Sequence, residues 1–301
     1  MEPSLAVSIG KMSLDGPAML ASGILGISLD VFGRLRRSGA AAIVSKSLSR
    51  EPWEGYANPT IVGVGGGGWI NAVGLSNPGA ENFADMIRQN RDVPIIVSLV
   101  GSDPADFEYM TGQFRECNIL GYELNLSCPH VAKVGLEVGD DLGLVKEIVS
   151  VVGSTGKPVI AKVGLGTVNY LDTVGAAVDA GADAITAINT VRAMAVDIHA
   201  RRPVLSNGFG GLSGSPIKPI AVRCVYEITS NYDVPVIGCG GVSTWEDVVE
   251  FMLAGASAVQ VGSAIGDRWV DVFSEINAGV ESYMRKHGYS ETEEMVGLAR
   301  S

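Results

Sequence analysis

The sequence predicts a (β/α)8 barrel, and two observations carry this prediction. Short apolar runs rich in β-branched residues recur along the chain, and segments long enough for helices follow them. The runs are apolar almost throughout, which is typical of strands buried on both faces of a parallel sheet. There are eight of them: Ala18–Ser22, Ala42–Lys46, Ile95–Val100, Tyr122–Ser127, Val159–Val163, Ala184–Asn189, Val236–Cys239 and Ala258–Val261.

The segments between the runs carry helical periodicity, as crossover helices require. Two of them are followed by Gly181 and Gly255, and glycine in that position commonly ends a helix. The main alternative is an open, doubly wound sheet, but no Gly-x-Gly-x-x-Gly sequence follows the first run. We therefore favour a barrel. The clearest predicted helices are Leu142–Val152, Tyr170–Ala180, Ile217–Thr229 and Thr244–Ala254.

The whole chain, residues 1–301, reads as one barrel domain with an N-terminal addition. No segment has the composition of a linker between domains. Residues 1–17 are expected to form a short β-hairpin, with Asp15-Gly16 as its turn, that caps the bottom of the barrel.

Composition excludes several classes of protein. A net charge of −11, with no block of Lys and Arg, argues against a nucleic-acid surface. No apolar stretch approaches the ~20 residues that span a membrane, and no signal peptide is visible. The cysteines and histidines are scattered, so we expect a reduced, cytoplasmic protein without a metal site. They are Cys117, Cys128, Cys224, Cys239, His130, His199 and His287.

Active sites of barrel enzymes lie at the carboxyl ends of the strands, so the candidate residues follow from the strand prediction. This collection is strongly polar for a chain that is 47% hydrophobic. It comprises Ser22, Gly23, Ser45, Lys46, Ser47, Ser98, Asn125, Ser127, Cys128, Lys162, Asn189, Thr190, Gly240, Gly241, Gly262 and Ser263.

Cys128 is the first of these residues to suggest catalysis. It stands where a strand ends before Pro129, and two amide side chains, Asn125 and Asn189, occupy similar strand ends. An isolated cysteine is more often a small buried hydrophobe. The polar setting favours a reactive thiol instead.

Two lysines, Lys46 and Lys162, end otherwise apolar strands. A buried charge without a partner is costly, so a purely structural role would be expensive. The alternative is that each side chain extends its ammonium group to solvent. The functional interpretation is cationic contact with an anionic ligand or an electron-rich ring.

Glycine-bearing strand ends indicate a phosphorylated cofactor. Gly240-Gly241 and Gly262-Ser263 follow the seventh and eighth runs, where barrels commonly bind phosphate through backbone N–H groups. Glycines there could also serve packing alone. A further segment, Asn71–Gly79, lies between the second and third runs, and its asparagines could simply form turns.

Taken together and in order, these segments resemble the class 1 dihydroorotate dehydrogenases, most closely the NAD-linked (class 1B) catalytic subunits. The resemblance covers essentially the whole chain. It rests on Ser45-Lys-Ser47, Asn71-Ala-Val-Gly-Leu-Ser-Asn-Pro-Gly79, Asn125-Leu-Ser-Cys-Pro129, Lys162, Asn189-Thr190, Gly211-Leu-Ser-Gly214 and Val236-Ile-Gly-Cys-Gly-Gly-Val242.

The resemblance implies an FMN-dependent oxidation of (S)-dihydroorotate to orotate in pyrimidine (UMP) biosynthesis. Cys128 would be the general base, with Lys46 as a second catalytic residue that favours its thiolate, and flavin N5 would be the hydride acceptor. The implied flavin-binding residues are Ser22, Lys46, Ser47, Ser98, Asn125, Lys162, Ile188, Gly214, Gly240, Gly241, Gly262 and Ser263. The implied substrate-binding residues are Lys46, Asn71, Ala72, Val73, Gly74, Leu75, Asn125, Asn189 and Thr190.

The resemblance also implies partners. The NAD-linked enzymes work as homodimers within a heterotetramer, whose iron–sulfur flavoprotein subunit carries FAD and a [2Fe-2S] cluster. This chain has neither a cysteine cluster nor a nicotinamide fingerprint, so NAD reduction would occur on that partner. Soluble relatives that reduce fumarate are an alternative for the electron acceptor.

Two other functions remain as alternatives. A dihydropyrimidine dehydrogenase-like FMN enzyme acting on uracil or dihydrouracil would also use a cysteine in an Asn-x-Ser-Cys-Pro-His setting. The Asn71–Gly79 segment argues against it, because in the dihydroorotate enzymes this loop binds a carboxylate that uracil lacks. A non-catalytic FMN-binding barrel would need neither the Cys128 thiol nor two strand-end lysines.

Overall fold

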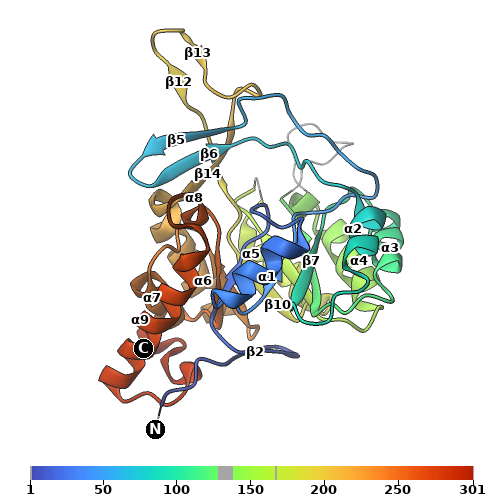
Figure 1. The fold of residues 1–301 in the computed structure, drawn as a ribbon. Helices are drawn as coiled ribbons and strands as arrows, with labels where there is room; N and C mark the ends of the chain where they lie inside the picture. Colours follow the sequence, from blue (N-terminus) through green and yellow to red (C-terminus); the bar gives the residue numbers. More distant parts are fainter. Residues whose placement is uncertain (1, 128–137, 167, 301) are drawn as a thin grey trace.

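The computed structural model describes residues 2–127, 138–166 and 168–300, and eight parallel strands close into a barrel (Figure 1). Both the strand prediction and the choice of a closed barrel over an open sheet are confirmed. In chain order the barrel strands are β3 (Ala18–Leu20), β4 (Ile43–Val44), β7 (Ile95–Leu99), β8 (Gly121–Asn125), β9 (Val159–Val163), β10 (Ala184–Ala187), β15 (Val236–Cys239) and β16 (Ala258–Val261).

Helices surround the barrel, and the four that the sequence showed most clearly are present. Asp141, Asn169 and Thr244 cap three of these helices by accepting a backbone hydrogen bond in the first turn. The helices are α1 (Leu29–Arg37), α2 (Ala80–Ile87), α3 (Pro104–Gln113), α4 (Leu142–Gly153), α5 (Tyr170–Asp179), α6 (Lys218–Asn231), α7 (Trp245–Ala254), α8 (Ala264–Arg268) and α9 (Val272–His287).

The N-terminal hairpin closes the bottom of the barrel, as predicted, but its turn lies elsewhere. Strands β1 (Val7–Ile9) and β2 (Met12–Leu14) pair with Ile9 opposite Met12, so the turn is Gly10-Lys11 and not Asp15-Gly16. Gly10 has φ +56°, which a two-residue hairpin turn favours. The apolar side chains of both strands are buried in one cluster with the lower barrel interior, including Met19 and Ile160.

A small antiparallel sheet covers the opposite, carboxyl end of the barrel and was not anticipated from the sequence (Figure 1). Its strand order is β11-β14-β6-β5, and a two-stranded hairpin extends from it. Glycine is depleted in strands, so these glycine-rich segments read as loops. The strands are β5 (Ile61–Gly65), β6 (Gly68–Asn71), β11 (Val191–Ala193) and β14 (Gly210–Gly214), and the hairpin is β12 (Val196–Asp197) with β13 (Arg202–Pro203).

Within residues 2–127, 138–166 and 168–300, no helix is both long and apolar enough to cross a lipid bilayer.

Asp247 ties the start of α7 to the loop that follows β15. Its carboxylate accepts hydrogen bonds from the backbone N–H groups of Ser243 and Thr244 and from Lys218 Nζ at 2.8 Å. Burial alone would raise the pKa of Asp247, but these donors outweigh it and hold the pKa below its ordinary value. The ionised carboxylate therefore stabilises the fold.

We predict that Asp247→Asn lowers the free energy of unfolding near neutral pH by about 1.5–3 kcal/mol, the range for hydrogen bonds to a charged group. A lowered folded-state pKa contributes stability above the ordinary value of 3.8, which is lost as the pH falls below it. The variant should therefore show a shallower loss of stability in acid than the native chain. Urea unfolding from about pH 3 to about pH 7 measures both effects.

Asp172 provides the matched control, because it occupies the same third position of helix α5 but is exposed. Asp172→Asn should change stability little. An equal loss in both variants would mean that the burial and partners of Asp247 are not the cause.

Candidate active site

Hydroxyl and amide groups from separate strand ends meet around Ser47. Its Oγ lies 3.3 Å from Ser22 Oγ and 3.0 Å from Ser98 Oγ, and it accepts a hydrogen bond from Asn125 Nδ2 at 3.2 Å. These residues follow or end β3, β4, β7 and β8, which are neighbours in the barrel. Four strand-end residues predicted from the sequence therefore form one connected network.

The network continues through the two asparagines that were expected to frame Cys128. Asn189 Nδ2 donates to Asn125 Oδ1 at 3.1 Å, and the backbone N–H of Ser127 donates to the same oxygen at 3.3 Å. Asn189 Oδ1 in turn accepts from the backbone N–H of Thr190 at 2.8 Å. The carboxamides are thereby fixed in orientation at the end of the barrel.

Cys128 itself lies outside the described residues, so its predicted role remains a prediction. Its chain neighbour Ser127 is described, and the Ser127 hydroxyl is buried without a hydrogen-bond partner in the described part of the chain. A buried polar group without a partner is unusual in a native protein. A hydroxyl of this kind is available to a ligand or to groups that the structure does not describe.

The antiparallel sheet brings Asn71 to the same end of the barrel. Asn71 Nδ2 donates to the carbonyl oxygen of Gly211 at 3.2 Å. Gly211 lies against Thr190, since a Cβ atom at Gly211 would be 2.0 Å from Thr190 Oγ1. Asn71, Thr190 and Asn189 thus lie in one region, although about 120 residues separate Asn71 from the other two.

The segment after Asn71 has an unusual backbone. Gly74 and Leu75 both have positive φ, +71° and +60°, and leucine rarely adopts that conformation. The Ala72 N–H already donates to the Thr60 carbonyl, while the Val73 carbonyl accepts from Tyr56. Non-glycine residues with positive φ cluster at ligand-binding segments. The N–H groups of Val73, Gly74 and Leu75 have no acceptor among the described residues.

The two strand-end lysines differ in environment. Lys46 is half-buried and forms no ion pair with a described acidic residue, and burial lowers its pKa. Lys162 is only 5% exposed, so the alternative that it extends to solvent is wrong. Its Nζ donates to Gln260 Oε1 at 2.9 Å and lies 3.6 Å from Glu123 Oε1. The first lysine is available to a ligand, and the second belongs to a buried polar cluster.

Sequence reasoning missed Glu123, Gln260 and Thr186, which form that cluster with Lys162. The sequence nevertheless contained a signal for this buried cluster. Glu123 and Gln260 are polar residues within strands that are otherwise apolar, and a buried polar side chain requires partners.

The glycines at the ends of β15 and β16 leave backbone donors unused. Cys239 and Gln260 are register partners, so Gly240-Gly241 and Gly262-Ser263 follow adjacent strands. Their four N–H groups donate to no described residue. Gly214 is close as well, because a Cβ atom at Gly241 would lie 2.9 Å from its carbonyl oxygen. This arrangement can accommodate a phosphate group.

Ile188, also predicted to bind the flavin, is buried between the asparagines of the network and the glycines at the ends of β15 and β16. Its backbone N–H donates to the carbonyl oxygen of Cys239 at 2.7 Å. This hydrogen bond links the asparagine side of the site to the glycine side.

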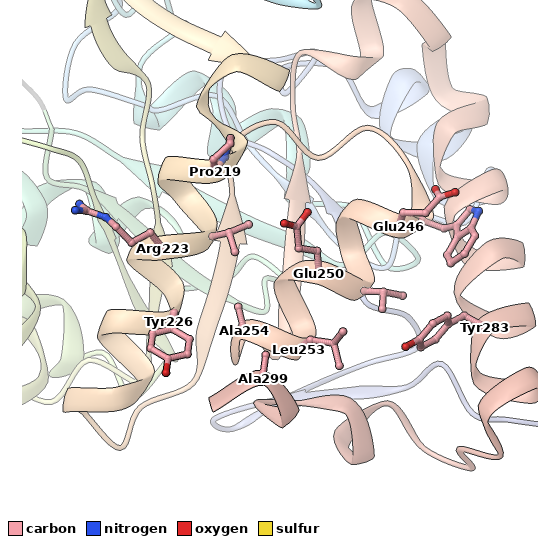
Figure 2. Close-up of a pocket in the computed structure, with 12 residues that line it drawn as sticks. Pro219, Arg223, Tyr226, Glu246, Glu250, Leu253, Ala254, Tyr283 and Ala299 are labelled. Carbon is pink, nitrogen blue, oxygen red and sulfur yellow. The ribbon is translucent and has the colours of Figure 1, made fainter. Parts of the chain in front are cut away.

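A surface groove of about 720 Å³ lies away from these strand ends, on the outer layer of helices (Figure 2). Arg223 and Tyr226 of α6, Glu250 of α7 and Tyr283 of α9 are among the residues that line it. It contains none of the strand-end residues, so we do not assign the chemistry to it.

Comparison with known proteins gives a consistent result over the whole chain. A family model described as dihydroorotate dehydrogenase matches residues 4–284. A Pyrococcus abyssi protein named dihydroorotate dehydrogenase B (NAD(+)), catalytic subunit, is 46% identical over 297 residues, covering 98% of this chain and 99% of the relative. A relative of the same name from Methanothermobacter thermautotrophicus is 43% identical over 299 residues, covering 98% of each chain. An Aeropyrum pernix protein named putative dihydroorotate dehydrogenase A (fumarate) is 42% identical over 302 residues, covering 99% of this chain and 98% of the relative.

We predict that Gly211→Ala disturbs the site and lowers the free energy of unfolding by about 1–3 kcal/mol, as overpacking does. The new methyl group would collide with Thr190, so either Thr190 or β14 must move. Gly63→Ala is the matched control in the same sheet, because its Cβ would make only an ordinary contact with Trp69 at 3.8 Å. Urea unfolding compares the two, and equal effects would show that the approach of Gly211 to Thr190 is not constraining.

Proposed function

Because this chain belongs to the dihydroorotate dehydrogenase family, we propose that it oxidises (S)-dihydroorotate to orotate with FMN as its cofactor, in de novo pyrimidine (UMP) biosynthesis. The observation that carries the proposal is the network from Ser47 through Asn125 to Asn189. It gathers side chains of the kinds that a flavin and a pyrimidine ring would use, at the end of the barrel where chemistry occurs. We also propose that the protein works in the cytoplasm, in keeping with its scattered cysteines.

The residues present fit FMN. Four unused N–H groups, from Gly240, Gly241, Gly262 and Ser263, would hold the phosphate. Ser22, Ser47, Ser98, Asn125, Ile188 and Gly214 would line the flavin, and Lys162 would supply a positive charge close to it. When bound, FMN supplies the hydride acceptor at its N5 atom.

The substrate would lie against the amide side of the network. Asn125 and Asn189 match a ring with amide and imide groups, because each carboxamide offers both an acceptor and donors. Lys46 is a cation without an acidic partner in the described residues, which suits a ligand carboxylate. Asn71, Thr190 and the segment Ala72 to Leu75 would complete this side, with the free N–H groups of Val73, Gly74 and Leu75 as donors.

Cys128 would take the proton from the carbon next to the substrate carbonyl. A free thiol has a pKa of about 8.5, so a cysteine can act as a base near or above neutral pH. It follows Ser127 in the chain, and the backbone N–H of Ser127 donates to the Asn125 carboxamide that would hold the substrate. A cation at Lys46 would favour the thiolate.

Electrons would leave through a partner. We propose a homodimer within a heterotetramer, whose iron–sulfur flavoprotein subunit carries FAD and a [2Fe-2S] cluster and reduces NAD. The names of several relatives, "catalytic subunit" and "NAD(+)", support a separate partner, while one relative is named for fumarate.

Exposed apolar side chains gather on the sheet and hairpin over the carboxyl end of the barrel, which supports an interface with that partner there. They are Ile61, Val64, Met194, Val196, Ile198 and Phe209.

We predict that the purified chain binds one FMN per protomer and that Gly241→Val abolishes this binding. The valine side chain would fill the space between Lys218 and the Gly214 carbonyl, beside the N–H groups that would hold phosphate. Flavin fluorescence after gel filtration measures retention. Gly156→Val is the control for backbone strain, because Gly156 has φ +75°, close to +80° at Gly241, but nothing within 4 Å of its Cβ position. Tight FMN binding by Gly241→Val would rule out this phosphate site.

The activity itself is tested by mixing the FMN-loaded protein with substrates in the absence of oxygen and following flavin absorbance. Dihydroorotate should bleach the flavin, and dihydrouracil should not. Cys128→Ala should keep FMN and bind orotate but slow bleaching by roughly 10²–10⁴-fold, the usual effect of losing a general base.

Cys117→Ala serves as the control, since this thiol is buried in the outer layer against the Ala84 carbonyl. Bleaching by dihydrouracil instead would favour the dihydropyrimidine dehydrogenase-like alternative. A native rate in Cys128→Ala would show that another group takes the proton.

A further inference from the structure

A buried carboxylate lies inside the barrel beneath the hydroxyl and amide network. Glu123 is fully buried on β8. Its Oε2 accepts a hydrogen bond from Thr186 Oγ1 at 3.0 Å and another from Gln260 Nε2. Its Oε1 has no hydrogen-bond partner among the described residues. The ammonium group of Lys162, 3.6 Å from Oε1, is the positive charge that faces it.

Lys162 is held from two sides in this cluster. Its Nζ donates to Gln260 Oε1 at 2.9 Å and forms the ion pair with Glu123. Gln260 thus bridges the two charges, with its amide oxygen on the lysine and its amide nitrogen on the carboxylate. Thr186 fixes the other side of the carboxylate. The contacts come from four strands, β8, β9, β10 and β16, so the barrel itself sets their geometry.

The cluster adjoins the candidate active site directly. Glu123 and Asn125 are two residues apart on β8, and alternation along a strand places both side chains on the same face. Lys162 is the register partner of Asn125 on the neighbouring strand. The charge pair therefore adjoins the carboxamide at the centre of the network, with Glu123 one same-face position before Asn125 on β8.

Of the groups close to the Lys162 ammonium, Glu123 is the one that pairs with it near neutral pH. Burial by itself would lower the pKa of Lys162, but the neighbouring Cys239 and Glu123 outweigh it and raise the pKa above its ordinary value. Among the described residues, these are the titratable groups that face Lys162. Burial raises the pKa of the Cys239 thiol, so this thiol is neutral at neutral pH. The ion-pair partner that remains for Lys162 is then the Glu123 carboxylate, 3.6 Å from its ammonium group.

We propose that Glu123 is a positioning residue that keeps Lys162 protonated and fixed beneath the flavin site, acting with Gln260 and Thr186. The flavin part of this inference rests on the function proposed above. A reduced flavin gains negative charge, and a permanently cationic lysine close to it stabilises that state. Without the carboxylate, Lys162 would be an unpaired buried cation, which loses its proton readily.

The first test uses Glu123→Gln loaded with FMN and measures the midpoint potential of the flavin from about pH 6 to about pH 10. The native protein should follow a smooth dependence on pH, because Lys162 stays charged. The variant should show an additional inflection where Lys162 loses its proton, with a lower potential above it. Thr186→Val is the control, since it removes the hydroxyl contacts to Glu123 and Gln260 but keeps both charges. An unchanged profile in Glu123→Gln would overturn the proposal.

A second test needs no flavin, so it separates this inference from the proposed function. In the native apoprotein, the raised pKa of Lys162 stabilises the fold at every pH below 10.5, the ordinary pKa of lysine. The free energy of unfolding contributed by this group should therefore not change between about pH 7 and about pH 9. In Glu123→Gln the folded-state pKa falls below the unfolded one, so stability should rise over that range. The double variant Glu123→Gln with Lys162→Met should lose this rise. A flat profile in Glu123→Gln contradicts the proposal.

The folding of the variants is informative as well. Glu123→Gln failing to fold while the double variant folds would support the proposal, because the unpaired lysine would be the cause. Failure of both would overturn it, since the carboxylate would then be needed by the barrel alone. Failure of the native chain to bind FMN would refute the proposed function and leave the apoprotein test valid.

Discussion

Closure of the barrel is the constraint on which the rest of the structure depends. The hydrogen bonds that join Ser22, Ser47 and Ser98 connect residues from three different strand ends. Asn125 and Asn189, which are 64 residues apart, meet because their strands flank β9 in the same closed sheet. Apolar residues on both faces of the strands hold the barrel together, so its polar groups are concentrated at one end. A separate catalytic domain is not required to assemble this site.

Two polar layers of different character are stacked at that end of the barrel. The upper layer consists of neutral hydroxyls and carboxamides, which can exchange their mutual hydrogen bonds for bonds to a ligand. The lower layer contains the buried charges of Glu123 and Lys162, whose desolvation is expensive and is offset by Gln260 and Thr186. A purely apolar layer would be the cheaper way to fill a barrel. The buried charge pair therefore fits a role in chemistry better than a role in packing.

The sequence predicted the barrel because strands buried on both faces are visible as apolar runs, as in Val159–Val163. It also indicated Ser47, Asn125 and Asn189, since polar residues at the ends of such runs are conspicuous. The hairpin turn was misplaced because Asp15-Gly16 has a stronger turn composition than Gly10-Lys11, and the pairing of Ile9 with Met12 decides the register. The sheet over the barrel was missed because glycine is depleted in strands, which hid the local β5–β6 hairpin, and because β6 pairs with β14 across about 140 residues. Glu123 was missed because its hydrogen-bond partners, Thr186 and Gln260, are 63 and 137 residues away in the sequence.

The most direct test of the account is a crystal structure of the protein with FMN and orotate. The account predicts the flavin phosphate on the N–H groups of Gly240, Gly241, Gly262 and Ser263, with the ring beside Lys162 and Asn125. It predicts orotate between Lys46, Asn71 and Asn189. A flavin bound in the groove between α6 and α7, or an orotate that contacts neither Asn125 nor Asn189, would contradict the assignment of the chemistry to the strand ends.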